Sequence, residues 1–367
     1  MKAEFLIENV EGFLPTIAKI LPIRSQIPVL ANILIEANKD GIFISATNLE
    51  IGTRIKIPGK VEEDGATTVP GKQFIEVLSS FPKDKVSLVL EKDSLVMKCR
   101  DNKASLQTIA KEEFPTLFEE YGDKIYEFDE NEMGNIFSKV IFAASIDEGR
   151  PELTGVYVVK NNESTDFVAT DGFRLSLKKV RGEKKISVDT SLIIPSKIIG
   201  EVIAAKTSGP ISMFMFQKAN QVVFESGDIL FVGRLINGDF PNYQRVIPKS
   251  HKTEIEVDSE ELSQKLKLSS IFARDNANVV KLNINSGKIE IHSQSSGLGQ
   301  GDVELAVKQD GEDNEISFNV KYITDALKYI QDKQVVIDLL SPVEPAVFKS
   351  ESDPDFIHII MPVRVQE

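Results

Sequence analysis

One short motif occurs twice in this chain, about 123 residues apart, and this repetition constrains the fold more than any other feature. The stretch SATNLEIGT covers residues 45–53, and VATDGFRLS covers residues 168–176. Each copy places an Ala-Thr pair at the end of an apolar run, followed by a short polar break and a second alternating run. A spacing close to the length of a small domain indicates a chain built from tandem copies of one unit.

Two series of amphipathic helices repeat at the same interval. The first series is expected near residues 10–17, 133–140 and 259–271, where apolar residues recur with helical spacing. Its apolar positions are Val10, Phe13, Leu14, Ile17, Met133, Ile136, Phe137, Val140, Leu262, Leu266 and Ile271. The second series starts after Pro70 and Pro195 and recurs at residues 318–330. Proline just ahead of the first turn suits a helix start because its φ is already fixed.

Between the helices lie strand–turn–strand segments with alternating apolar and polar residues. We place the third copy of the Ala-Thr motif at His292-Ser293, with its sequence drifted. The pattern predicts an α+β chain of three tandem similar domains, each with two helices on antiparallel sheets. The expected domains are residues 1–122, 123–250 and 251–367. Three copies of one unit can form an arc, and two arcs joined head to tail close a ring if the rotation fits.

The charge is unevenly placed along the chain. The formal net charge of −13 argues against a general nucleic-acid coat, but acidic residues concentrate in loop-like segments such as residues 110–124. The polar sides of the expected helices carry Lys19, Lys72, Lys139, Lys197, Lys206, Lys265, Lys267, Lys321 and Lys328. Surface helices often carry lysine, but the same bias in three repeats favours a common cationic face for sequence-independent phosphate contacts.

Targeting and redox signals are few. The N-terminus lacks the pattern of a signal peptide, and no apolar run approaches the ~18 residues of a membrane span. Cys99 is the single cysteine, so an intrachain disulfide is excluded and a cytoplasmic location is expected.

No enzyme signature emerges. The three histidines are scattered without metal-ligand spacing, and SGLGQGD lacks the G-K-[ST] ending of a phosphate loop, so no metal or cofactor is expected. Two alternatives stay open: a hydrolase that uses Asp171 and Arg174 of the hairpin, and a monomeric adaptor without DNA contact. Mass measurement with and without nicked circular DNA would separate these possibilities.

The whole chain resembles the bacterial DNA polymerase III beta subunit family, the sliding clamps. The resemblance rests on the order and spacing of IPVLANILIEA, SATNLEIG, RPELTGVYV, ATDGFRLS, GDFPNYQRVIPK, SFNVKYITDAL and HIIMPVRV. It implies a non-catalytic processivity factor of the replicative polymerase. In such a factor, a head-to-tail ring dimer encircles double-stranded DNA and tethers the polymerase, the clamp loader and other proteins that carry a clamp-binding motif.

The resemblance also implies site residues. A partner-peptide pocket between the second and third domains would be lined by Leu153, Thr170, Gly172, Phe173, Arg174, Leu175, Pro241, Arg245, Val246, Asn319, Tyr322, Val343, Ile359, Met361, Pro362, Val363 and Arg364. There Arg174 and Arg245 would hold the peptide backbone or its carboxylates. Arg24 and Arg150 match loop positions that would join the lysines in DNA contact. The chain departs from the family at RDNANVV, where relatives can carry an aromatic residue at one edge of the pocket.

An exposed strand edge predicts the dimer contact. Residues 103–109, which include Leu106, form an expected edge strand of the first domain, and an unpaired edge is a liability. We expect this edge to meet Ile271 and Phe272 of the third domain of a second copy.

Overall fold

The computed structural model describes residues 1–117, 121–182, 186, 191–205, 207 and 209–364. The chain divides into two compact units, which are described separately. Unit 1 consists of Met1–Met133 and Lys197–Leu235, and unit 2 consists of Gly134–Ser196 and Ile236–Glu367. This division falls inside the second expected domain, so the boundaries at residues 122 and 250 stay predictions.

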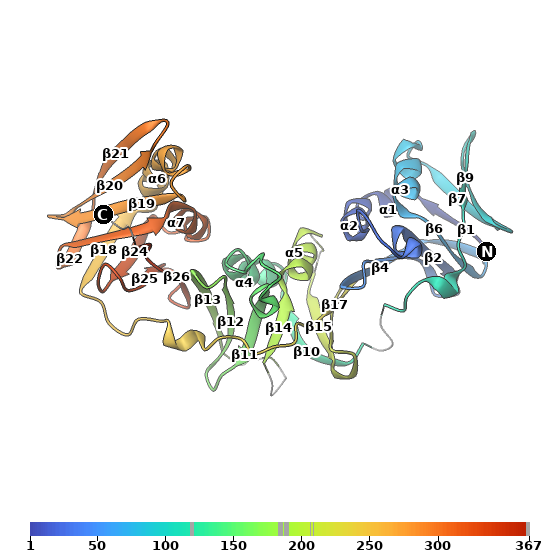
Figure 1. Ribbon diagram of the computed structural model, residues 1–367. Coiled ribbons are helices and arrows are strands. Elements are labelled where there is room, and N and C mark those ends of the chain that lie inside the picture. The colour runs from blue at the N-terminus through green and yellow to red at the C-terminus, as the bar shows by residue number, and fades with distance from the viewer. Residues whose placement is uncertain (118–120, 183–185, 187–190, 206, 208, 365–367) are drawn as a thin grey trace. The chain divides into compact units, whose positions relative to one another are not determined.

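Unit 1 contains two antiparallel sheets (Figure 1). The first has the order β5 (Gly59–Glu63), β1 (Lys2–Leu6), β7 (Lys85–Glu91), β8 (Ser94–Cys99), β9 (Asn102–Gln107). The second has the order β10 (Asp123–Phe128), β15 (Ile211–Phe216), β16 (Gln221–Ser226), β17 (Ile229–Arg234), β4 (Ile51–Ile57), β3 (Gly41–Thr47), β2 (Asn32–Asn38), β6 (Gly65–Pro70). Its helices are α1 (Glu8–Glu11), α2 (Leu14–Ile20), α3 (Gly71–Ser80) and most of α5 (Ser196–Ala204).

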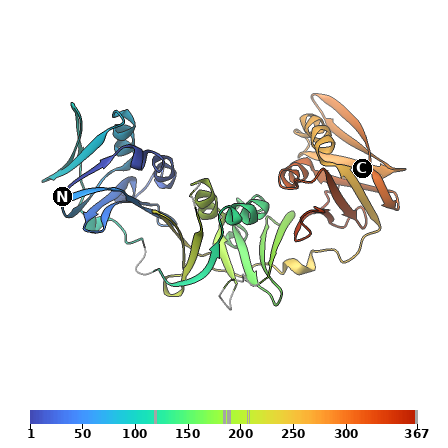
Figure 2. The same cartoon turned by 180° about the vertical axis from the view of Figure 1, so that it is seen from behind.

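Unit 2 also contains two antiparallel sheets. The larger has the order β14 (Leu192–Pro195), β11 (Gly155–Lys160), β12 (Ser164–Thr170), β13 (Arg174–Arg181), β26 (Phe356–Ile360), β25 (Ala346–Lys349), β24 (Gln334–Leu339), β18 (Thr253–Asp258), β22 (Lys308–Gly311). The smaller has the order β21 (Gly299–Ala306), β20 (Lys288–Ser295), β19 (Val279–Asn285), β23 (Asn314–Asn319). Most of α4 (Glu132–Ile141) belongs to this unit, as do α6 (Ser259–Ala273) and α7 (Val320–Leu327), which lie side by side (Figure 2).

Both predicted helix series are present, with two local differences. The first helix is divided into α1 and α2, because Pro15 has no N–H to donate to a preceding turn and sits instead at the start of α2. In α6, Leu262 and Leu266 are buried as predicted, but Ile271 is 47% exposed, so its assignment to the apolar face is wrong.

The repeated motif forms the same turn in its first two copies. The hydroxyls of Thr47 and Thr170 donate to the carbonyl four residues later, at 2.9 and 2.6 Å. Each hydroxyl also accepts the N–H two residues later, at 3.0 Å. The next side chain, Asn48 or Asp171, accepts two further backbone N–H groups. Local hydrogen bonding of this kind stabilises a tight turn between strands.

The third copy lies two residues later than predicted. β20 continues to Ser295, whose hydroxyl accepts the N–H of Gly297, two residues on, and of Leu298. The placement at His292-Ser293 is therefore wrong, because both residues lie inside β20 and not at its end.

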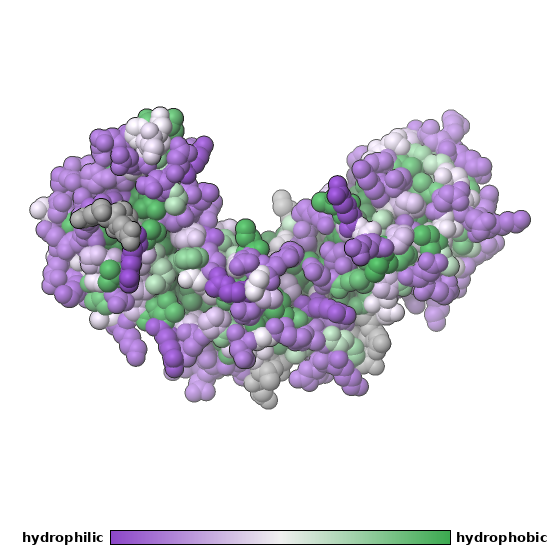
Figure 3. Space-filling view, in the orientation of Figure 1, coloured by the Kyte–Doolittle hydropathy of each residue, from purple (hydrophilic) through white to green (hydrophobic). Residues whose placement is uncertain are grey.

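Each larger sheet joins strands from two of the expected domains. In unit 1, β4 pairs with β17, and in unit 2, β13 pairs with β26. Among the described strands, β9 and β21 each lie at the end of a smaller sheet and pair on one side only. Hydrophilic residues dominate the visible face of each unit, and smaller groups of apolar residues show among them (Figure 3). In the described part of the chain, no helix has the length and apolar character needed to cross a bilayer.

Candidate functional site

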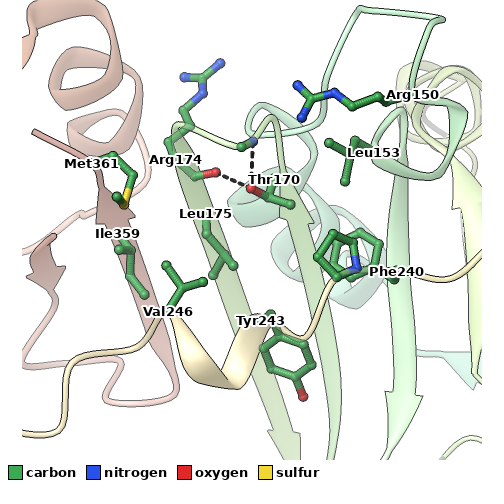
Figure 4. A pocket seen from close by; sticks show the side chains of 12 residues that line it. Arg150, Leu153, Thr170, Arg174, Leu175, Phe240, Tyr243, Val246, Ile359 and Met361 are labelled. Carbon is green, nitrogen blue, oxygen red and sulfur yellow. Dashed lines mark hydrogen bonds between the residues drawn. The ribbon is translucent and has the colours of Figure 1, made fainter. Parts of the chain in front are cut away.

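A pocket in unit 2 lies where β13 meets β26, beside the segment that follows residue 238 (Figure 4). It contains about 550 Å³ of space, part of it open to solvent. Its lining residues are Arg150, Leu153, Thr170, Gly172, Arg174, Leu175, Phe240, Pro241, Tyr243, Val246, Ile359 and Met361.

One wall of the pocket is the rigid turn between β12 and β13. Asp171 Oδ1 accepts the N–H groups of Phe173 and Arg174 at 2.9 and 3.0 Å, and Asp171 Oδ2 accepts from Arg174 Nε at 3.0 Å. Gly172 has a φ of +92°, which favours glycine. Both oxygens of Asp171 are thus committed to the turn, which speaks against the alternative of a hydrolase at this hairpin.

The floor of the pocket is apolar. Leu153, Leu175 and Ile359 are buried beneath it, whereas Val246 is 38% exposed at its lip. Figure 4 shows Val246 and Ile359 beside Leu175, with Met361 further along on the β26 side. This surface suits apolar side chains of an extended ligand, because their burial removes apolar area from water.

Two further wall residues, Phe240 and Tyr243, were missed in the sequence. The Phe240 ring stacks on Tyr157 with 4.6 Å between ring centroids. The Tyr243 hydroxyl donates to Asp166 Oδ2 at 2.8 Å, and burial, followed by the nearby Asp166 charge, raises the pKa of Tyr243 to about 12. The signal was present, since both aromatic residues flank Pro241 in the motif GDFPNYQRVIPK.

Arg174 is committed within the protein. Its side chain is 12% exposed, and its Nη1 lies 2.8 Å from Asp325 Oδ2. Its Nη2 donates to the carbonyl of Phe142 at 2.7 Å, and its guanidinium carbon lies 4.6 Å from the Tyr322 ring centroid. Together with the Asp171 bond, three of its N–H groups therefore fasten the pocket wall to neighbouring segments.

Arg150 stands at the rim of the same pocket. Its Nη2 donates to the carbonyl of Asp171 at 3.2 Å, and its guanidinium lies over Gly172. Figure 4 shows the Arg150 side chain beside Leu153, on the opposite side of the Thr170 turn from Arg174. The sequence assigned Arg150 to DNA contact, whereas the structure places it at the pocket.

Eight other residues assigned to the pocket lie outside its lining: Phe173, Arg245, Asn319, Tyr322, Val343, Pro362, Val363 and Arg364. Several have a different structural role. Asn319 caps α7 by accepting the N–H of Lys321, and Val363 donates its N–H to the carbonyl of Ser317 at 2.8 Å. Val343 is 56% exposed in the loop after β24.

The residues assigned to DNA contact differ in their availability. Arg24 and Lys72 are exposed, and Lys265 is half-buried. Lys139 was expected to contact DNA, but it is ion-paired with Asp353 and mostly buried, so it is a poor phosphate ligand. Lys328 and Lys197 are exposed but lie 2.8 Å from Asp325 and 3.8 Å from Glu50. Lys206 lies outside the described residues.

The residues assigned to the dimer contact lie on two elements. Leu106 belongs to the edge strand β9 and is half-buried. Ile271 projects from α6, and the ring of Phe272 lies against Gly301 in the edge strand β21.

One histidine has acidic neighbours close enough to share an ion. Ligand atoms of His251, Glu254 and Asp338 lie within 4.8 Å of one another. Asp338 is already ion-paired with Lys349, and His251 Nδ1 lies 3.4 Å from Asp338 Oδ2. Lys349 thus already supplies a cation to this cluster.

Comparison with known proteins covers the chain from end to end. Family models for the N-terminal, central and C-terminal domains of the DNA polymerase III beta subunit match residues 3–118, 127–242 and 244–364. A beta sliding clamp of Chlamydia muridarum is 28% identical over 356 residues, which is 96% of this chain and 95% of that protein.

Solved structures show the same fold. The DNA polymerase sliding clamp of Bacillus subtilis superposes with a TM-score of 0.94 and 26% identity, and covers all of both chains. A sliding clamp of Pseudomonas aeruginosa bound to griselimycin superposes with a TM-score of 0.93 and 24% identity, again over both whole chains.

Proposed function

This chain belongs to the DNA polymerase III beta subunit family, the beta sliding clamps, and from that membership we infer how its pocket, strand edges and helices are used. It is a three-domain, non-catalytic processivity subunit that keeps the replicative polymerase on DNA. We assign the pocket to short segments of the polymerase, the clamp loader and other clamp-binding proteins. The chain would act where bacterial DNA is replicated, in the cytoplasm.

The observation that carries the pocket assignment is an apolar floor beside a turn that is already rigid. Leu175 and Ile359 form a buried surface, while Val246 and Met361 are accessible at the lip. A site that is formed before binding loses little conformational entropy when a peptide docks. Apolar anchors such as leucine and phenylalanine would fill the floor, and Arg150 at the rim would favour an acidic group.

Peptide titration tests this assignment. The probe is a short peptide that contains glutamine, leucine and phenylalanine, with griselimycin as a competitor. We expect one peptide per chain, displaced by griselimycin. Val246→Asp should weaken binding at least tenfold, because it places a charge at the apolar lip. The control Ile23→Asp changes an exposed apolar residue of unit 1, and equal effects of the two variants would contradict the assignment.

The open strand edges support a head-to-tail homodimer. In each larger sheet, a hairpin strand of one domain pairs with the last strand of the next domain, as in β4–β17 and β13–β26. β21 and β9 are the corresponding strands, and in the described part of the chain each ends its own sheet and pairs on one side only. Pairing β21 of one chain with β9 of a second chain would complete the third junction and remove both exposed edges.

Light scattering tests the dimer. Replacing Ile271 and Phe272 with Ala should shift dimer to monomer at nanomolar protein, because it removes apolar contacts beside β21. The control Leu298→Ala changes another exposed apolar residue, in the turn before β21. A double variant that stays dimeric at nanomolar concentration would show that the contact lies elsewhere.

The helix lysines support sequence-independent DNA contact inside the ring. Binding to linear duplex should be weak and should fall steeply with salt, since phosphate contacts release counterions. Charge reversal of Lys72 and Lys265 should shorten retention on nicked circular DNA, whereas reversal of Lys218, an exposed lysine outside these helices, should not. Tight binding to one sequence that is insensitive to salt would exclude the sliding mechanism.

A further inference from the structure

The frame of the pocket occurs twice in this chain. Leu153 of the pocket lies in a 3₁₀ turn that starts at Pro151, and Leu30 lies in the matching turn that starts at Pro28 in unit 1. Both leucines are buried, and the N–H group of each donates a hydrogen bond to the carbonyl three residues earlier. The Thr170 turn has its counterpart in the Thr47 turn, with the same hydrogen bonds.

The linker that borders the pocket is repeated as well. The segment FPNY at residues 240–243 borders the pocket, and FPTL stands at residues 114–117. The neighbouring strand also corresponds: Leu175 pairs with Ile359 in unit 2, while Gly52 pairs with Val232 in unit 1. Unit 1 therefore contains counterparts of the buried leucine, the turn, the linker and the strand pair that frame the pocket in unit 2.

The two copies differ at their centre. In unit 2 the floor position is Leu175, and the pocket above it is open. In unit 1 the floor position is Gly52, and a Cβ added there would lie 2.7 Å from Leu117 Cδ2. The Leu117 side chain thus lies directly on Gly52, in the space that a side chain at residue 52 would need. The side-chain amide of Gln221 donates to the Leu117 carbonyl at 3.0 Å and holds the segment there.

A second difference explains why the linker residue enters one copy and not the other. Tyr243 corresponds to Leu117, and its hydroxyl is bonded to the Asp166 carboxylate. The residue that corresponds to Asp166 in unit 1 is Phe43, which offers no acceptor on its side chain. Leu117 has neither a hydroxyl nor an acidic partner, so its side chain is most stable in apolar surroundings away from water.

We propose that Leu117 is a built-in plug that occupies the first copy of the pocket and limits each chain to one peptide site. This proposal rests on the proposed function of the open pocket. The plug places a leucine against an apolar strand pair, which is the contact assigned to a partner peptide in unit 2. Removing the plug should therefore expose a second site for the same ligand class, an extended peptide with leucine or phenylalanine anchors.

Calorimetric titration of the full-length protein counts the sites. With the glutamine-, leucine- and phenylalanine-containing peptide, the wild type should bind one peptide per chain. Leu117→Ala should bind two, the second at least tenfold more weakly because the site lacks a rim arginine: Ile27 stands where unit 2 has Arg150. The control Thr116→Ala changes the exposed neighbouring residue and should leave one site.

A melting experiment tests the plug without any peptide. Gly52→Ala adds a methyl group against Leu117, so it should lower the melting temperature by several degrees. In combination with Leu117→Ala the same substitution should have little effect, because the space has been vacated. If Gly52→Ala lowers the melting temperature equally in the wild type and in the Leu117→Ala protein, the plug proposal is overturned.

The outcomes separate the two proposals. If the wild type binds one peptide and Leu117→Ala also binds only one, the plug is overturned and the proposed function stands. If the wild type binds no peptide, the proposed function of the open pocket fails, and the idea of a second peptide site fails with it.

Discussion

Arg174 is expected to contribute to stability as much as to the shape of the pocket. Arg174→Ala removes a guanidinium that bonds Asp171 Oδ2 at 3.0 Å, Asp325 Oδ2 at 2.8 Å and the Phe142 carbonyl at 2.7 Å. The truncation would leave two carboxylates and one carbonyl without this donor in a mostly buried setting. The substitution therefore tests whether the wall of the pocket is fastened by this one side chain.

The expected loss in the free energy of unfolding follows from how deeply the ion pair between Arg174 and Asp325 is buried. Breaking a buried ion pair by removing one partner costs about 3–5 kcal/mol. The Asp325 side chain is 28% exposed and keeps Lys328 as a second partner at 2.8 Å, so the low end of that range applies. We expect Arg174→Ala to lower the free energy of unfolding by about 3 kcal/mol.

The pH dependence has a definite sign. Burial raises the pKa of Asp325, but hydrogen bonds from Lys328 and Arg174 outweigh it, so the pKa is lowered overall. A carboxyl with a lowered pKa stabilises the fold above its unfolded value of about 3.9, and that stability is lost as the pH falls through its folded value. The difference between wild type and Arg174→Ala should therefore be full at pH 7 and shrink below pH 4.

Chemical denaturation measures the effect, and a double-mutant cycle with Asp325→Ala isolates the pair. Arg174→Lys is the matched control: it keeps the charge but cannot reach all three acceptors, so it should fall between the other two proteins. An Arg174→Ala protein within about 0.5 kcal/mol of wild type, the range of ordinary surface substitutions, would refute this reasoning.

Three further predictions concern the same unit. Deleting Val363–Glu367 should weaken the peptide by about 1 kcal/mol, because the bond from Val363 N–H to the Ser317 carbonyl no longer positions the tail beside the pocket; melting should change little, and unchanged affinity in the titration would exclude this role. Tyr243→Phe should destabilise the fold by about 1–3 kcal/mol by leaving Asp166 Oδ2 without this donor; since the raised pKa of about 12 favours the neutral phenol, wild-type stability should fall between pH 10 and 12, and the variant should show a smaller fall in denaturation curves. Burial lowers the pKa of His358 to about 3, so its neutral form stabilises the fold above pH 6.5 and stability should decline as the pH falls below that value; His358→Gln should flatten the decline, and identical acid profiles would contradict this assignment.

The sequence by itself determined the repeated elements. Helix faces such as Met133, Ile136, Phe137 and Val140 follow from a local period, because burying one side of a helix requires apolar residues at fixed spacing. The turn at Asp171 and Gly172 was equally readable, since its hydrogen bonds and its positive φ involve only neighbouring residues. The family resemblance rests on these local patterns, taken in order along the chain.

Only the tertiary structure decided which side chains are available. The sequence could not show that Asp353 neutralises Lys139 or that Asp325 holds Arg174. Both partners lie more than 150 residues away along the chain, and contacts of that range depend on strand pairing that no local pattern encodes.

The same limit applies to the two copies of the pocket. The sequence shows FPTL and FPNY as similar segments, but not that Leu117 lies on Gly52 while Tyr243 bonds to Asp166. Which copy is open depends on the side chains that three separated segments bring together. Those segments meet only when the strands pair into their sheets, so the chain's local patterns specify the frame twice and the tertiary packing decides where it is open.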